Sequence, residues 1–152
     1  MKKFTILFTI LVFSTIVFAQ TKYDTYGNAR FGYSISYPSN LIPKGEAENG
    51  DGQVFEAKDK SAKLTVWGSN NALDQSLKEI YNGDLKEYGK AVTYKSLGAN
   101  SYVISGKRNG KIFYQKTIKS ADDVYFTFIL EYSENKRATY DKAVTQIVKS
   151  FK

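Results

Sequence analysis

The sequence contains no histidine and no cysteine among its 152 residues, and only two prolines. Histidine is the commonest general base and the commonest metal ligand, while cysteine supplies thiol nucleophiles and thiolate ligands. Their absence excludes Ser-His and Cys-His nucleophile pairs and the usual zinc, copper and haem sites. Because disulfides are also excluded, the fold must be stabilised by a hydrophobic core.

The other residue types give no catalytic pattern. The glycines of residues 45–52 match neither the Walker nor the dinucleotide fingerprint. Two carboxylate pairs, Glu46 with Glu48 and Asp122 with Asp123, lie in predicted turns, where water would solvate both members. We therefore predict no catalytic residue, no cofactor-binding residue and no metal ligand, and a protein that is not an enzyme. An active site built on lysine or tyrosine is the alternative left open.

The first 19 residues have the pattern of a secretory signal peptide. Lys2 and Lys3 are followed by an apolar run over residues 4–18, and Ala19 offers a small residue at the cleavage position. The run is shorter than the roughly 20 residues that span a membrane. We predict cleavage after Ala19 and a secreted or periplasmic protein without stable membrane insertion. An uncleaved anchor is the alternative.

The charge is basic but dispersed. The chain has 22 Lys and Arg against 15 Asp and Glu, a formal net charge of +7. A basic exported protein could meet anionic lipid, surface polysaccharide or an acidic protein. No run of five or six basic residues occurs and no aromatic stacking motif interleaves them, so nucleic-acid binding is not predicted.

The residues after the signal peptide predict an N-terminal arm over 20–30 and a single α+β domain over 31–152. Asn109-Gly110 predicts a tight hairpin, because a type I′ turn needs positive φ at both central residues. Alternating apolar side chains predict seven strands, over residues 31–37, 53–58, 62–68, 92–97, 102–107, 111–119 and 124–132.

Apolar residues at steps of three and four predict two helices. The first runs from Leu73 to Tyr88, capped by Asn70 or Asn71, and the second begins at Ser133 and ends at Phe151. The strand before the second helix, with Phe128 at its centre, has one deeply buried face and is the core of the predicted domain.

The longest irregular segment is residues 38–52, which is rich in Gly, Asn and Pro, and the loop from Pro43 to Gly52 within it is the predicted binding surface. It carries Glu46, Glu48 and Asp51, whose spacing does not match an EF-hand. Trp67 is expected beside this loop, because the strand that leaves the loop pairs with the strand that ends at Trp67. We expect these four residues to bind a partner. The alternatives are a solvated flexible loop and a tryptophan covered by a helix.

A family resemblance is carried by Phe31-Gly32-Tyr33-Ser34-Ile35-Ser36-Tyr37-Pro38, which resembles the opening "GF-x-hydrophobic-x-YP" strand of the PsbP-like superfamily. The hairpin, the mid-chain helix, the meander with Asn109-Gly110 and a closing helix ending at Ser150-Phe151 follow in that superfamily's order. The superfamily includes photosystem extrinsic subunits, a nuclear-transport protein that binds the Ran GTPase, and bacterial exported proteins of the DcrB type.

This resemblance implies an α-β-α sandwich, with a central, mainly antiparallel sheet of about seven strands and helices on both faces. It implies no functional residue, because the matching positions are fold-forming ones. Characterised members are mostly non-catalytic, so we expect an exported binding or accessory protein of the cell envelope, with an envelope protein as partner. A small-ligand carrier or sensor, with a pocket between sheet and loop, and a hydrolase of unknown type are the alternatives. The sequence does not indicate an oligomeric state.

Overall fold

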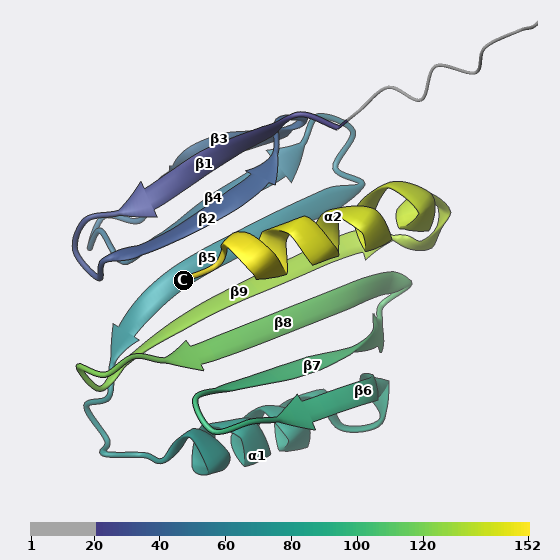
Figure 1. Ribbon diagram of the computed structural model, residues 1–152. Coiled ribbons are helices and arrows are strands. Elements are labelled where there is room, and N and C mark those ends of the chain that lie inside the picture. Colours follow the sequence, from purple (N-terminus) through teal and green to yellow (C-terminus); the bar gives the residue numbers. More distant parts are fainter. Residues whose placement is uncertain (1–20) are drawn as a thin grey trace, which may run out of the picture.

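The computed structural model describes residues 21–152, which form two sheets and two helices (Figure 1). The predicted signal peptide lies outside the described residues. The helices are α1 (Leu77–Tyr88) and α2 (Arg137–Ser150). The strands are β1 (Tyr23–Asn28), β2 (Tyr33–Pro38), β3 (Leu41–Glu46), β4 (Gly52–Ala57), β5 (Ala62–Asn70), β6 (Val92–Leu97), β7 (Ser101–Arg108), β8 (Lys111–Lys119) and β9 (Val124–Ser133).

The larger sheet is antiparallel, with seven strands in the order β3-β4-β5-β9-β8-β7-β6. Strand β9 lies at its centre, paired with β5 on one side and β8 on the other. Both faces of β9 are therefore covered: Phe128 is fully buried on one face, and Tyr125 and Thr127 are buried on the other. The predicted central strand and its buried Phe128 are confirmed.

A first hydrophobic cluster joins α2 and the β1-β2 hairpin to the larger sheet. In Figure 1, α2 crosses the sheet at β5 and β9, and the hairpin lies beside it. The helix contributes Tyr140, Ala143 and Ile147 at steps of three and four, as its apolar stripe predicts. The other buried members of this cluster are Tyr33, Ile35, Tyr37, Leu41, Phe55, Ala57, Ala62, Leu64, Val66, Phe126, Phe128, Leu130, Tyr132 and Phe151.

A second, smaller cluster lies under α1. Its buried members are Leu77 of the helix, Tyr102 and Ile104 of β7, Phe113 of β8 and Tyr125 of β9. Tyr125 alternates along β9 with the side chains of the first cluster, since successive side chains of a strand point to opposite faces.

The segment expected as an N-terminal arm contains β1, which pairs with β2 in a separate two-stranded sheet. The other edge of β2 meets the C-terminus: the Ser34 N–H donates to the Lys152 carbonyl, and the Lys152 N–H donates to the Ser34 carbonyl. β1 has little alternation to reveal it, because only one of its six residues is buried. The predicted strand 31–37 is thus real, but it belongs to the hairpin and not to the larger sheet.

The predicted long loop is also wrong in extent, because β3 occupies its middle. β3 is an edge strand that pairs only with β4, and its register shifts between Pro43 and Glu46. Proline is tolerated on an edge, and Gly45 adopts a positive φ of 103° at the irregularity. The larger sheet therefore has the expected number of strands with a different membership, and the loop shrinks to residues 47–51.

Both helices begin later than predicted. Ser76 caps α1, accepting a hydrogen bond from the Glu79 N–H while the Glu79 carboxylate accepts one from the Ser76 N–H. Asn71 instead bonds the backbone of Gln75, and Leu73 is 79% exposed. Ser133 makes no side-chain cap, because a 3₁₀ turn over Glu134–Lys136 precedes α2.

The predicted Asn109-Gly110 turn is confirmed, with φ of 53° and 72° at the two residues. Among residues 21–152, no helix is long and apolar enough to cross a membrane.

Candidate functional site

Three of the four predicted site residues lie around one hollow. Glu46, Asp51 and Trp67 line a cavity of about 330 Å³ between the β3-β4 loop and the sheet, whereas Glu48 is exposed in the same loop and does not line it. Gly52 pairs directly with Trp67, which brings the loop against the tryptophan. A Cβ at Gly52 would lie 2.1 Å from the Val66 carbonyl oxygen, so only glycine allows this approach.

The loop is held in place by the β1-β2 hairpin. Asn28 Nδ2 donates to the Gly50 carbonyl at 3.0 Å, and the Tyr33 hydroxyl donates to the Asp51 carbonyl at 2.9 Å. Arg30 donates to the Asn49 carbonyl. These bonds tie the five-residue loop to a second element of the fold.

The loop carboxylates carry negative charge without internal compensation. Within residues 21–152, Glu46, Glu48 and Asp51 form no ion pair. Glu46 accepts a hydrogen bond from the Tyr26 hydroxyl at 2.7 Å, and Asp51 accepts one from Asn49 at 2.7 Å. The hollow is therefore an acidic spot with an aromatic wall on a chain of net positive charge.

Trp67 also borders a second cavity, of about 310 Å³, between α1 and the sheet. Ile80, Asp84, Glu87 and Tyr88 enter it from α1, at helical spacing. The sheet contributes Trp67, Ser69, Tyr102, Gln115, Thr117, Tyr125, Thr127 and Ile129. Four aromatic rings and one interior carboxylate thus share a single cavity.

Asp84 is the centre of a polar network in this cavity. Its Oδ2 accepts hydrogen bonds from the Tyr102 hydroxyl and from Gln115 Nε2. Gln115 Oε1 in turn accepts from the Tyr88 hydroxyl at 3.1 Å. Gln115 is 4% exposed and Thr117 1%, so these polar groups are part of the protein interior.

The network perturbs the ionisation of its members. Burial raises the pKa of Asp84, while the hydrogen bonds from Tyr102 and Gln115 act in the opposite direction. Burial, reinforced by the adjacent Asp84 carboxylate, raises the pKa of Tyr102 far above its ordinary value. Tyr102 therefore stays protonated and serves as a hydrogen-bond donor to Asp84.

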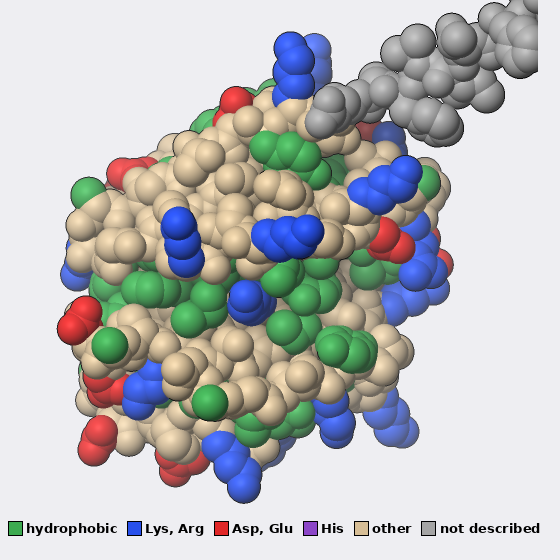
Figure 2. All heavy atoms as spheres, viewed as in Figure 1, with side chains coloured by type: hydrophobic (Ala, Val, Ile, Leu, Met, Phe, Trp, Pro, Cys, Tyr) green, Lys and Arg blue, Asp and Glu red, His purple; other side chains and the backbone are tan. Residues whose placement is uncertain are grey.

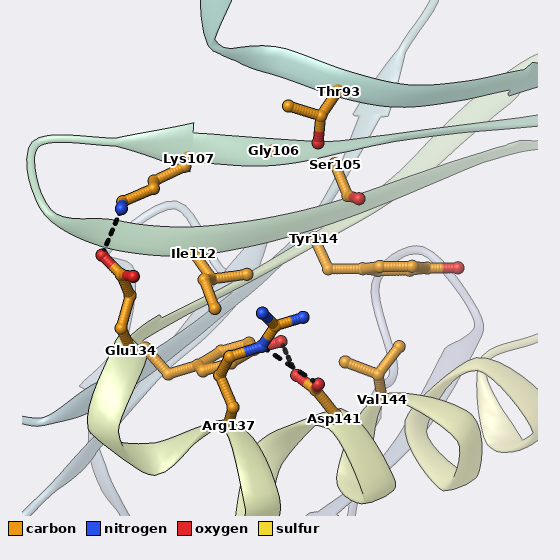
Figure 3. A pocket seen from close by; sticks show the side chains of 11 residues that line it. Thr93, Ser105, Gly106, Lys107, Ile112, Tyr114, Glu134, Arg137, Asp141 and Val144 are labelled. Atoms are coloured by element: carbon orange, nitrogen blue, oxygen red, sulfur yellow. Dashed lines mark hydrogen bonds and ion pairs between the residues drawn. The ribbon is translucent and has the colours of Figure 1, made fainter.

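A third hollow, of about 410 Å³, lies between α2 and strands β7 and β8 (Figure 3). Its charges neutralise one another: Lys107 pairs with Glu134 at 2.5 Å and Arg137 with Asp141 at 3.4 Å. Its apolar wall includes Ile112, Tyr114, Tyr132 and Val144. Figure 2 shows hydrophobic side chains gathered in a band below α2, with basic side chains around them.

Within the described part of the chain, no group of three or more carboxylates comes close enough together to hold a metal ion. What the arrangement offers is recognition: aromatic walls, fixed hydrogen-bond groups and localised negative charge.

No protein-family model matches the sequence, and no curated protein matches it. Among solved structures, the chain is similar to the solution structure of cyanobacterial PsbP (CyanoP) from Synechocystis sp. PCC 6803, with a TM-score of 0.63. The superposition covers 91% of this chain and 96% of that one. The fold is PsbP-like. Sequence identity is 15%, so the likeness concerns the fold.

Sequence reasoning missed the Asp84 network of this PsbP-like fold. One signal was present: Asp84 stands on the apolar stripe of α1, four residues after Ile80 and four before Tyr88. A second was the position of Thr117 and Thr127 within two predicted strands; the structure buries both and places them in a hydrogen bond with each other at 2.9 Å. Polar residues at core positions of neighbouring elements indicate a shared buried network.

Proposed function

We propose that this protein is an exported, non-enzymatic binding protein of the cell envelope, and that a protein partner docks on the surface formed by Glu46, Asp51 and Trp67. The observation that carries the proposal is that these residues, separated by up to 21 positions in the sequence, line one hollow. Tryptophan is enriched among the residues that dominate binding energy, and it is most effective beside polar groups that exclude water.

The partner's chemistry follows from the charge of the hollow. Carboxylates without an ion-pair partner favour a lysine or arginine side chain on the partner, packed against the indole. Because hydrogen bonds from Asn28, Arg30 and Tyr33 already order the loop, binding would cost little conformational entropy.

The test is capture of a partner from native envelope extract, with variants of the full chain. Replacing Glu46→Gln and Asp51→Asn together should weaken capture roughly tenfold, since two charge-assisted contacts are lost. Glu48→Gln is the matched control, because Glu48 lies in the same loop outside the hollow and its replacement should leave capture unchanged. Equal capture by the double variant and the control would remove this surface from consideration.

Export is the part of the proposal supported by residues 1–19. Intact-mass analysis of the protein made in its own envelope tests it. A mass that begins at Gln20 is expected, and a mass that retains residues 1–19 would show a membrane-anchored protein instead.

The fold supports a non-catalytic role by resemblance, since the chain resembles accessory and binding proteins of the PsbP-like superfamily, among them exported DcrB-type proteins. We also infer that the helices form the two outer layers of an α-β-α sandwich. Support comes from the separate clusters under α1 and α2, whose side chains alternate along β9.

A small-ligand carrier is the second candidate, favoured by the volume of the same hollow. About 330 Å³ is at the lower end of the range for ligand pockets. A rise in melting temperature with a metabolite library, lost in Trp67→Ala, would favour the carrier, because a ligand that binds the native state stabilises it by mass action.

A further inference from the structure

The cavity under α1 holds a carboxylate that lacks a countercharge. Within residues 21–152, no basic side chain forms an ion pair with Asp84. Both of its hydrogen bonds go to Oδ2, and Oδ1 receives none from these residues. Since no fully buried side-chain oxygen there lacks a partner, Oδ1 is accessible to solvent. A partly desolvated negative charge therefore lines a half-open cavity.

The walls of the cavity complement a positive charge. The rings of Trp67, Tyr88, Tyr102 and Tyr125 line it, and the faces of such rings attract cations. Two of the rings already carry cations: Arg108 lies 4.6 Å from the ring centre of Tyr88, and Lys119 lies 5.6 Å from that of Tyr125. Trp67 and Tyr102 have no such contact among the described residues.

The rim adds a second negative charge. Glu87 lines the cavity, and its ion pair with Arg108 is long, at 3.9 Å, with both side chains well exposed. Such an exposed pair neutralises little of the local field. The loop before α1 is tied to the cavity wall, where the Tyr125 hydroxyl donates to the Gln75 carbonyl at 2.7 Å.

We propose that this cavity binds a small organic cation, either a primary amine or a quaternary ammonium compound, with the Asp84 carboxylate as its counter-ion and the indole of Trp67 as its wall. A metal ion fits less well, because no three carboxylates of the described residues meet there and aromatic rings form much of the wall. An organic cation uses the ring faces and the carboxylate together. The site shares Trp67 with the hollow at the loop, but Asp84 lies outside that hollow.

Trp67 is the only tryptophan, so its intrinsic fluorescence reports on this cavity. Its fluorescence should change saturably on titration with choline or with n-butylammonium, and the two probes distinguish a quaternary from a primary ammonium site. The comparison compound is 3,3-dimethyl-1-butanol, the neutral carbon analogue of choline. Choline or butylammonium should bind at least roughly tenfold more tightly than this neutral analogue, since only a cation gains the charged contact.

Asp84→Asn keeps an acceptor for Tyr102 and removes the charge. It should reduce binding of the cation roughly tenfold while leaving the neutral analogue unchanged. Glu48→Gln, an exposed carboxylate outside this cavity, is the matched control and should leave the affinity unchanged. The proposal is overturned if neither cation binds saturably, if the neutral analogue binds as tightly, or if Asp84→Asn and Glu48→Gln behave alike.

Discussion

Phe128→Ala gives a quantitative test of the core. Phe128 is fully buried at the centre of β9. Its ring centre lies 5.1 Å from that of Phe151 in an edge-on contact and 6.0 Å from that of Tyr114 in a stacked contact. Truncating a buried phenylalanine costs about 3–5 kcal/mol. Aromatic pairs contribute roughly 0.5–1.5 kcal/mol each beyond burial, so two such contacts favour the upper half of that range.

The assay is equilibrium unfolding in urea, followed by Trp67 fluorescence. With a denaturant slope of about 2 kcal/mol/M, a loss of 3–5 kcal/mol lowers the midpoint by about 1.5–2.5 M. Leu73→Ala is the control: Leu73 is 79% exposed, and its truncation should stay within about 0.5 kcal/mol of the parent. A midpoint shift below about 0.5 M for Phe128→Ala would mean that the strand register is displaced by one residue.

Two further predictions concern backbone geometry and helix capping. Gly106→Ala should destabilise the protein by roughly 1–3 kcal/mol in thermal melts, because the new Cβ would lie 1.8 Å from the Ala91 carbonyl oxygen. Gly83→Ala is the control: its Cβ would meet open space on α1, and it should stabilise the protein by about 0.5–1 kcal/mol. Equal effects of the two variants would refute the close approach at β7. Ser76→Ala removes the α1 capping box and should lower the free energy of unfolding by about 1 kcal/mol. If the helical circular dichroism of this variant on heating matched that of the parent, the result would contradict the observed helix start.

Local features of the sequence were sufficient for much of the fold. The alternation through Phe128, the β4-β5 hairpin and the Asn109-Gly110 turn each depend on residues close in the chain, where side-chain period and turn chemistry act directly. The buried stripe of α2 follows from the same kind of periodicity.

The edge strands were missed for a physical reason. β1 and β3 each bury only one of their six residues, so nothing selects alternation, and their pairing depends on partners elsewhere in the chain. Several residues could cap α1, and tertiary contacts decided among them. Asn71 donates a hydrogen bond to the carboxylate of Asp123, 52 positions away, and Ser76 is the cap.

The candidate sites also depend partly on local sequence and partly on tertiary contacts. The sequence by itself determined that the loop carboxylates would lie near Trp67, because antiparallel pairing sets that neighbourhood. Only the tertiary structure decided that Glu48 does not line the hollow and that Asp84 accepts hydrogen bonds from Tyr102 and Gln115. Those contacts join α1 to two strands, and an aspartate carboxylate is desolvated only when distant segments of the chain pack around it.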